Sequence, residues 1–315
     1  MTRFAVIGTG GVGGVFGAEL HAAGYDVSFT ARGGNLAALR ANGLQVFSPG
    51  ATLRVPPERF FGNPADIGPV DVILLCVKSY DTESALRQLT STVRSDTVVI
   101  SLQNGVEKAE MIQALLPGSI FFDGVAYVAA VISGPGQITE VGSPRRILFA
   151  PPHDAPQNLW KRARDLCALC RMADFKAEVP VDISLELWKK FIFITAAGGL
   201  TALMRMPLKQ ILGTEESRQL FIDAMGETES VARARGISIP SGYTGRVMES
   251  LAGVDPAIYS SLYYDLIKNK PLEIDALSGT VARLGFSNGI PTPVHRMIYA
   301  ALVPHHRQHL ARMNA

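Results

Sequence analysis

Cysteine is scarce in this chain of 315 residues, and three cysteines exclude a framework of disulfide bonds. Cys76 lies in an apolar run, and Cys167 and Cys170 form one CxxC with no second pair. Buried, reduced thiols are therefore favoured over zinc or redox chemistry. An excess of one charge is also lacking, because 30 basic side chains oppose 28 acidic ones and leave a net charge of +2. Non-specific electrostatic binding of nucleic acid is therefore not expected.

Long hydrophobic runs are missing too. The longest uncharged apolar stretch, residues 191–204, has 14 residues, whereas a bilayer span needs about 20. We interpret it as a buried helix and expect no membrane partner. The apolar N-terminal run ends at Gly8 without a small-residue cleavage site, so a secretion signal is not expected. The sequence predicts a cytoplasmic protein.

Hydrophobic residues make up 47% of the chain, enough for a large buried core. In the first half, short apolar runs alternate with helical patterns. Continuous apolar strands separated by helices predict a parallel sheet that is covered on both faces, a Rossmann-type doubly wound α/β fold. Strands are predicted at 4–7, 26–30, 70–77, 97–102, 121–132 and 136–149, with a turn at 133–136. Helices are predicted from the first glycines to about 23 and at 35–42, 81–93, 107–116 and 158–173.

The character of the sequence changes after about residue 155. From residue 185 onward nearly everything has helical spacing, broken by prolines and glycines. We place the domain boundary near residue 181. The prediction is a dinucleotide-binding domain at 1–181 and an all-helical substrate domain at 182–315, an α/β plus all-α protein.

A glycine-rich turn follows the first predicted strand and opens a helix. Its residues fit the GxGxxG pattern of dinucleotide-binding sites: Gly8, Thr9, Gly10, Gly11, Val12 and Gly13. Gly8 permits the tight turn, Gly10 removes a Cβ that would strike phosphates, and Gly13 lets the helix pack on the strand. The helix N-terminus then faces a pyrophosphate. A glycine turn without a ligand is the alternative.

The end of the second predicted strand indicates which dinucleotide binds. NAD-preferring sites usually carry an acidic residue there, which accepts a hydrogen bond from the ribose 2′-hydroxyl. Asp26 stands at the start of the strand, the wrong end, and Arg32 stands where a 2′-phosphate would lie. A guanidinium matches a phosphate with paired donors. We predict NADP(H), with an ordinary solvated arginine as the alternative.

Several short motifs accompany the glycine turn and Arg32. They are CVKSY at 76–80, QNG at 103–105, WKKF at 188–191, LTA at 200–202, YSS at 259–261, Asp265, EID at 273–275 and GIPTP at 289–293. No single run is decisive. In their order and spacing, over nearly the whole chain, the sequence resembles the ketopantoate reductase (2-dehydropantoate 2-reductase) family.

The resemblance implies a Rossmann-type domain, a helical domain and a substrate bound in the cleft between them. It implies that NADPH reduces a 2-oxo acid, ketopantoate to pantoate, as a step of pantothenate biosynthesis. By match to the family motifs, Lys190 is the catalytic lysine and Glu273 is its acidic partner. Lys78 and Asn104 lie near the nicotinamide, and Ser261 contacts the substrate carboxylate.

The residue types suit that chemistry. Hydride delivery to a ketone builds negative charge on oxygen, which an ammonium group stabilises and can protonate. The alternative for Lys190 is a surface pair with Glu186, one helical turn earlier. Ordinary structural roles are likewise the alternatives for Glu273, Lys78, Asn104 and Ser261.

The sequence departs from the family in the expected substrate pocket. The family typically has asparagines four and eight residues after the lysine, and one more immediately before YSS. Here these positions are Ile194, Gly198 and Ile258. A buried polar group that lacks its partner costs about 1–3 kcal/mol. We therefore predict that the preferred substrate is a bulkier or less polar 2-oxo acid or ketone.

Weaker features leave other possibilities open. His305, His306 and His309 have a spacing that can bind a metal, but we predict a solvated tail and no metal. Tyr263, Tyr264 and Trp188 are predicted in the core or an interface. The rival functions are another two-domain dehydrogenase, of the 3-hydroxyacid or glycerol-phosphate type, and a non-catalytic NADP sensor. The apolar helices of the second half could form a homodimer interface or only their own core.

Overall fold

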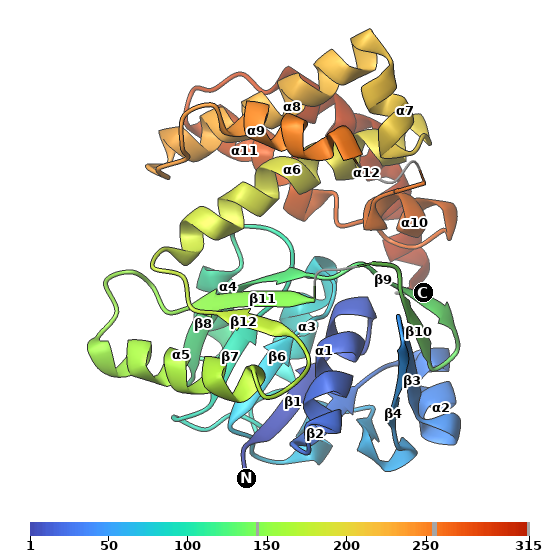
Figure 1. The fold of residues 1–315 in the computed structure, drawn as a ribbon, viewed down its shortest axis with the longest axis vertical. Coiled ribbons are helices and arrows are strands. Elements are labelled where there is room, and N and C mark those ends of the chain that lie inside the picture. The colour runs from blue at the N-terminus through green and yellow to red at the C-terminus, as the bar shows by residue number, and fades with distance from the viewer. Residues whose placement is uncertain (143–144, 254–256, 314–315) are drawn as a thin grey trace. The chain divides into compact units, whose positions relative to one another are not determined.

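The structure is a computed structural model that describes residues 1–142, 145–253 and 257–313 (Figure 1). The chain forms two compact units. The first comprises residues 1–103 and 108–183, and the second comprises residues 104–107 and 184–315. Each unit has its own buried hydrophobic core.

The first unit is built on an eight-stranded sheet in the order β12-β11-β8-β7-β6-β1-β2-β5. The neighbouring strands β5, β2, β1, β6, β7 and β8 are parallel, and β11 runs antiparallel to β8. The strands are β1 Arg3–Ile7, β2 Asp26–Thr30, β5 Phe60–Phe61, β6 Val72–Leu75, β7 Val98–Ser101, β8 Ile120–Tyr127, β11 Arg146–Ala150 and β12 Lys176–Glu178. The parallel strands β5-β2-β1-β6-β7-β8, with β1 between β2 and β6, have the order of a doubly wound dinucleotide-binding fold.

Both faces of the sheet are buried. Along β1, Phe4 and Val6 pack in one hydrophobic cluster with Phe16, whereas Ala5 and Ile7 pack in another. This alternation follows from the two-residue period of a strand. The predicted Rossmann-type fold is confirmed, with helices on both faces: α1 Gly11–Ala22, α2 Gly33–Asn42, α3 Thr82–Arg87, α4 Ala109–Leu115 and α5 Gln157–Cys170.

A second, four-stranded sheet was not predicted. Its order is β4-β3-β10-β9, formed by β4 Ala51–Val55, β3 Leu44–Ser48, β10 Gln137–Glu140 and β9 Ala130–Gly134. The predicted single strands at 121–132 and 136–149 are wrong, because each divides between the two sheets. Residues 143–144 of the second prediction lie outside the described residues. The predicted helix at 81–93 is also shorter, since α3 ends at Arg87.

The small sheet lies against helix α1. A Cβ added to Gly14 would lie 2.1 Å from Ile138 Cδ1, and one added to Gly11 would lie 2.7 Å from the carbonyl oxygen of Ala130. Glycines in the first turns of α1 therefore allow β9 and β10 to approach the helix closely.

The second unit is helical. Its elements are α6 Ile183–Met204, α7 Leu208–Gly213, α8 Glu215–Ala234, α9 Tyr243–Ser250, α10 Ser261–Ile267, a π-helix at Asp275–Gly279, α11 Thr280–Ser287 and α12 Pro293–Met313. By length and composition, α6 is the one helix among the described residues that could cross a membrane, but 67% of its apolar window is buried. It is therefore a core helix, and Trp188 lies in that core against Phe191.

The C-terminal histidines do not form a solvated tail, so that prediction is wrong. Helix α12 continues through Pro304, and His306 and His309 are buried. His306 Nδ1 accepts a hydrogen bond from the Leu272 amide at 3.1 Å. Among the described residues, no group of three His, Cys, Asp or Glu side chains could hold a metal ion. The cysteines are free thiols, with Cys167 and Cys170 buried.

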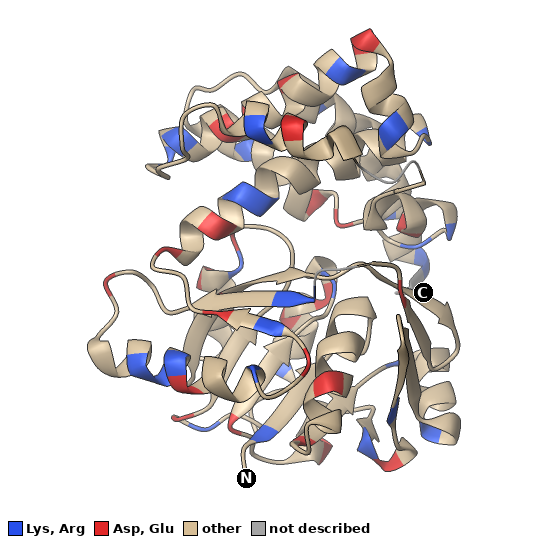
Figure 2. Ribbon diagram, in the orientation of Figure 1, with Lys and Arg blue, Asp and Glu red and all other residues tan. Residues whose placement is uncertain are grey.

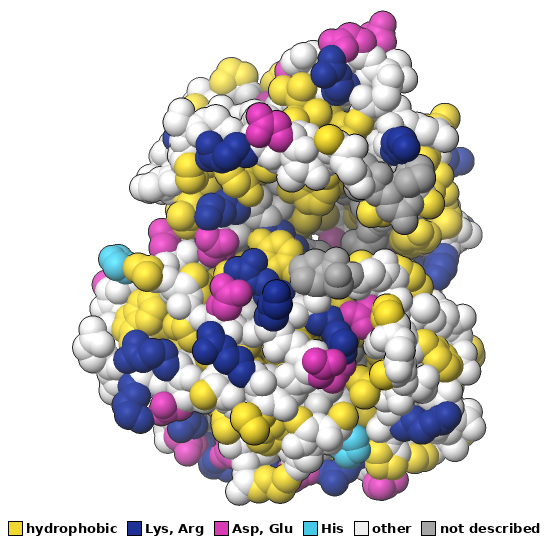
Figure 3. Space-filling view, in the orientation of Figure 1, with side chains coloured by type: hydrophobic (Ala, Val, Ile, Leu, Met, Phe, Trp, Pro, Cys, Tyr) yellow, Lys and Arg dark blue, Asp and Glu magenta, His cyan; other side chains and the backbone are white. Residues whose placement is uncertain are grey.

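Charges of both signs are interspersed along the elements of each unit (Figure 2). The face displayed in Figure 3 likewise mixes acidic, basic, hydrophobic and neutral side chains.

Candidate functional site

The glycine turn between β1 and α1 has the geometry of a phosphate cradle. Gly8 has a φ of +104°, and a Cβ on it would lie 2.8 Å from the Val77 amide nitrogen. A Cβ on Gly13 would lie 2.3 Å from the Gly8 carbonyl oxygen. A Cβ on Gly10, by contrast, would meet nothing within 4 Å. Gly8 and Gly13 are thus required by the protein's own packing, whereas Gly10 leaves bare backbone beside open space.

Hydrogen bonds hold this turn to the end of β2. The Thr9 amide and hydroxyl both donate to the Thr30 carbonyl, at 3.0 and 2.9 Å. The Gly8 amide donates to Thr30 Oγ1 at 3.1 Å. Helix α1 begins with Gly10 as a side-chain-free N-cap and has no acidic residue in its first turn. Its N–H groups and the positive end of its dipole therefore suit a pyrophosphate, and the residues fit a dinucleotide.

Arg32 lies at the carboxyl end of β2, as the N-cap residue of α2. Its side chain is 58% exposed and forms an ion pair with Asp81, which follows β6. Asp26 lies at the opposite end of β2, where it binds Arg3 and Arg59. The Asp26 carboxylate on β2 therefore forms its ion pairs at the end of the strand that lies away from the glycine turn.

Lys78 stands at the same edge of the sheet as the glycine turn. It precedes the 3₁₀ turn Ser79–Asp81 that follows β6, and β6 pairs in parallel with β1. Its side chain is half-buried. Because the carboxyl ends of parallel strands meet at one edge, Lys78 is placed where this fold class binds its ligands.

Lys190 is half-buried on helix α6, and its Nζ donates a hydrogen bond to Asn104 Oδ1 at 2.9 Å. Glu186, named above as the alternative partner, accepts a hydrogen bond from Lys189 at 2.8 Å. The structure thus brings together two of the predicted site residues, from chain positions 86 residues apart. Asn104 comes three residues after the last residue of β7.

Residues that sequence reasoning missed hold the segment that contains Asn104. Glu107 forms an ion pair with Arg283 of α11, and Gly105 has a φ of +99°. Lys108 donates to the Gln103 carbonyl at 2.7 Å, immediately before Asn104. No local pattern distinguishes these charges from ordinary surface residues.

Lys108 is a buried cation in the first unit. Its Nζ lies 3.5 Å from Asp123 Oδ1 and 3.3 Å from the Gly124 carbonyl oxygen. Desolvation lowers the pKa of the Lys108 ammonium, and Asp123 opposes that effect. These contacts fix the lysine on β8, so that its bond to Gln103 restrains the start of the loop.

Glu273 is 6% exposed and stands just before the π-helix. Its carbonyl accepts a hydrogen bond from the Leu277 amide at 3.1 Å. The flanking residues are also held, because His306 binds the Leu272 amide and the Tyr299 hydroxyl donates to Asp275 at 2.8 Å. π-Helical turns are frequent at functional sites.

The residues predicted to bind substrate lie on α6 and around the start of α10. Lys190, Ile194 and Gly198 follow one another at four-residue spacing on α6 and so share a face. A Cβ on Gly198 would meet only side chains of Leu262 and Leu277, at 3.8 Å or more. This position therefore accepts a Cβ without a clash.

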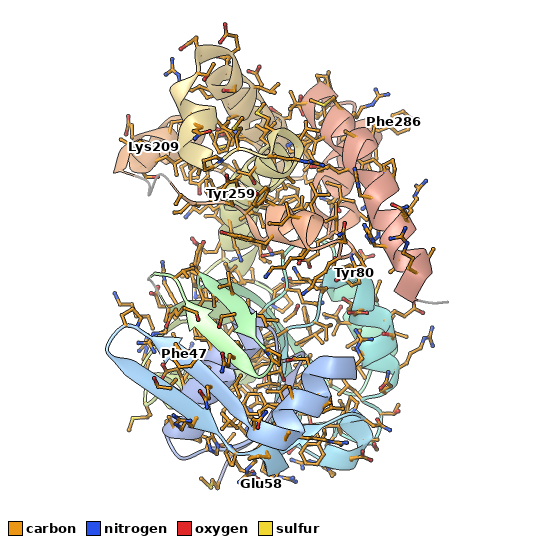
Figure 4. All side chains as sticks on the ribbon, turned by 90° about the vertical axis from the view of Figure 1, so that its right-hand side faces the viewer. Phe47, Glu58, Tyr80, Lys209, Tyr259 and Phe286 are labelled. Carbon is orange, nitrogen blue, oxygen red and sulfur yellow. The ribbon has the colours of Figure 1, made fainter. Side chains whose placement is uncertain are left out.

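The start of α10 packs against that helix. Ser260 is the N-cap residue of α10, and its hydroxyl lies 3.4 Å from the Gly198 carbonyl oxygen. Ser261 is exposed, and Ile258 is 44% exposed. Tyr259 stacks on Tyr263 with 4.0 Å between ring centroids, and Tyr264 meets both rings edge-on. Figure 4 labels Tyr259 within this aromatic group.

The first unit has a doubly wound sheet with a phosphate cradle, and the helical unit has a lysine, Lys190, that is hydrogen-bonded to Asn104. These features define the class of two-domain dinucleotide-dependent oxidoreductases. The family model of ketopantoate reductase PanE/ApbA matches residues 4–153, and the model of its C-terminal part matches residues 182–305. The chain belongs to the ketopantoate reductase PanE/ApbA family, oxidoreductases that act on CH–OH or C=O groups.

Individual relatives agree with this assignment. A 2-dehydropantoate 2-reductase of Mesorhizobium japonicum is 28% identical over 312 residues, which covers 92% of this chain and 94% of the relative. The crystal structure of a PanE/ApbA family ketopantoate reductase from Ralstonia eutropha JMP134 has a TM-score of 0.87 and 29% identity, covering 98% of this chain and 100% of that one.

A third protein shares the fold. The ternary structure of D-mandelate dehydrogenase with NADH and anilino(oxo)acetate has a TM-score of 0.89 and covers 98% of this chain and 99% of that chain. Its identity to this chain is 22%, so it supports the fold alone.

Proposed function

We propose that this protein is an NADPH-dependent reductase of 2-oxo acids. Residues 1–181 would bind the dinucleotide, and residues 182–315 would supply the substrate site and the acid group. The observation that carries the proposal is the Lys190–Asn104 hydrogen bond, because it holds an ammonium group on the segment that follows β7. Reduction of a ketone needs such a cation, since negative charge develops on the carbonyl oxygen.

The cofactor, when bound, supplies the hydride. The glycine turn would hold its pyrophosphate through the N–H groups of the first turn of α1, and Arg32 would bind a 2′-phosphate. Lys78 would lie beside the nicotinamide end. These assignments follow from the open space at Gly10 and the position of Lys78 at the same sheet edge.

The helical unit would supply the proton and orient the substrate. In this proposal Lys190 Nζ binds the carbonyl oxygen and donates a proton to it as the alcohol forms. Asn104 accepts one N–H of the ammonium and so helps to orient it. Glu273 would help to organise substrate and lysine, and the exposed Ser261 hydroxyl would bind the substrate carboxylate.

The substrate is expected to be bulkier or less polar than ketopantoate. Ile194, Gly198 and Ile258 cannot supply the amide groups that a hydroxy-substituted acid uses, and Gly198 leaves room. The stacked Tyr259 and Tyr263 favour an aryl-substituted 2-oxo acid as the second candidate, because aromatic rings pack well on one another.

The test is oxidation of NADPH by the purified protein with a panel of carbonyl compounds. The panel contains ketopantoate, 2-oxoisovalerate, phenylglyoxylate, 3-oxo acids and dihydroxyacetone phosphate. The proposal predicts turnover of a 2-oxo acid, with the less polar members favoured. Ketopantoate as the best substrate, at the efficiency of a dedicated enzyme, would end the argument for a changed pocket. Turnover of only the last two classes would favour another dehydrogenase, and no turnover would favour a sensor.

Two further predictions concern the location of the protein and its oligomeric state. The reaction draws on NADPH and 2-oxo acids, so we propose the cytoplasm as its location, which fractionation of cells expressing the tagged chain would test. A homodimer stays a prediction from the apolar helices of the second half. Light scattering on the purified protein distinguishes a 33.8 kDa monomer from a particle of twice that mass.

A further inference from the structure

The Arg32–Asp81 ion pair joins two strand ends that flank the glycine turn. Arg32 follows β2, and Asp81 follows β6. Both strands pair in parallel with β1, on either side of it. The ion pair therefore spans the carboxyl end of β1, just where the phosphate cradle begins. Tyr80, the middle residue of the turn that carries Asp81, is labelled in Figure 4.

Asp81 is the more firmly held partner of the two. Its side chain is 19% exposed, against 58% for Arg32. Its amide donates to the Lys78 carbonyl at 2.9 Å, and its own carbonyl accepts from Ser84 Oγ at 3.0 Å. The backbone at Asp81 is thus fixed by the turn, and its carboxylate pairs with Arg32 from the other side of β1.

A carboxylate in this place bears directly on the two dinucleotides. A ribose 2′-hydroxyl can donate a hydrogen bond to it, as it does to the acid that usually ends the second strand of NAD sites. A 2′-phosphate carries about −1.5 to −2 charge near neutral pH and would be repelled. Arg32 has the opposite preference, because its guanidinium attracts the phosphate. The two residues therefore act against each other.

We propose that Asp81 is a cofactor-specificity residue that offsets Arg32, so that the site accepts NADH as well as NADPH. The inference deepens the proposed function and rests on it, since it requires a dinucleotide at the glycine turn. The sequence does not reveal this, because the carboxyl end of β2 has no acid and Asp81 comes from the turn after β6, on the other side of β1.

The test is direct titration of the purified protein with NADPH and NADH, followed by nucleotide fluorescence. The variants are Asp81→Asn, Asp81→Ala and Arg32→Ala, with Asp96→Asn as a control, because Asp96 is an exposed acid paired with Arg94. The unmodified protein should bind both nucleotides, with Kd values within about tenfold of each other. Asp81→Asn and Asp81→Ala should tighten NADPH about three- to tenfold without tightening NADH. Arg32→Ala should weaken NADPH selectively.

Competition with adenosine fragments locates the effect. Adenosine 2′,5′-bisphosphate and 5′-AMP differ only in the 2′-phosphate, so Asp81→Asn should strengthen the first and leave the second unchanged. Thermal unfolding confirms that each variant is folded. An NADPH-to-NADH ratio that stays within twofold in both Asp81 variants would overturn the inference while leaving the reductase proposal standing. Failure of the unmodified protein to bind either nucleotide would overturn both.

Discussion

Lys190 donates a hydrogen bond to Asn104 across 2.9 Å, and this bond ties helix α6 to the short segment that follows β7. The bond distinguishes Lys190 from Lys189, its neighbour on the same helix, because the two side chains have different hydrogen-bond partners. Lys189 donates to Glu186 on the same helix, whereas Lys190 donates to the amide oxygen of Asn104.

Removal of that amide should weaken catalysis without weakening cofactor binding. We expect Asn104→Ala to lower kcat about 10- to 100-fold, because the ammonium loses the acceptor that orients it. The Kd for NADPH should change little. Asn288→Ala is the control, since Asn288 also makes a side-chain hydrogen bond but lies exposed at the end of α11. An equal loss in both variants would contradict the role of Asn104.

The glycine turn offers a matched pair of substitutions. Gly10→Ala should leave folding intact, since nothing lies within 4 Å of the new Cβ, but it should weaken NADPH binding at least about tenfold by intruding on the phosphates. Gly13→Ala places its Cβ 2.3 Å from the Gly8 carbonyl and should destabilise the fold by about 1–3 kcal/mol. Nucleotide titration and chemical unfolding separate the two effects. Normal NADPH binding by Gly10→Ala would remove the pyrophosphate from this turn.

The substrate pocket can be tested by restoring amides. We expect Ile194→Asn together with Gly198→Asn to raise kcat/KM for ketopantoate at least about tenfold, because each regained hydrogen bond is worth about 1 kcal/mol or more. A Cβ at position 198 makes only ordinary van der Waals contacts. Ile194→Val controls for loss of packing on α6. If the double variant gains nothing on ketopantoate and loses nothing on less polar acids, these positions do not face the substrate.

A buried histidine predicts how stability depends on pH. His295 Nε2 lies 2.9 Å from both Thr228 Oγ1 and the Ala224 carbonyl oxygen, and burial lowers the pKa of this histidine from 6.5 to about 4. Between these values the unfolded chain binds a proton that the native protein does not, so stability falls as pH falls from 6.5 to about 4. The loss amounts to about 3 kcal/mol.

His295→Gln isolates this contribution. The variant should be less stable than the parent at pH 7, because the buried hydrogen bonds of the imidazole are disturbed. Its free energy of unfolding should then decline less between pH 6.5 and 4. Urea unfolding at a series of pH values measures both slopes, and parallel curves for the two proteins would show that His295 does not titrate as the structure implies.

Much of the fold could be predicted because its signals are local. The strand, glycine turn and helix of residues 3–22 are contiguous, and periodicity shows where the helical half begins. The second sheet could not be predicted, since β3 pairs with β10 across about 90 residues of sequence. Strands β3 and β4 are short and polar at several positions, so neither composition nor alternation distinguished them from loops, whereas β9 and β10 overlap longer strands that were predicted.

The candidate site could likewise be predicted only in part from the sequence. The family motifs singled out Lys190, Asn104 and Glu273, and the structure joins the first two by a hydrogen bond and buries the third. Asp81 and Lys108 escaped notice because their significance depends on partners from other strands. A charged residue gives no local sign of whether it will be buried or which residue it will meet.

The central claim is that Lys190 acts as the acid group in reduction of a 2-oxo acid. The most direct measurement compares Lys190→Ala with Lys189→Ala, for the initial rate of NADPH oxidation with the best 2-oxo acid and for the Kd of NADPH. Lys190→Ala should lose about 10²- to 10⁴-fold in kcat with an unchanged Kd, whereas Lys189→Ala, which loses only its pair with Glu186, should retain activity. Equal rates in the parent and Lys190→Ala would contradict the account.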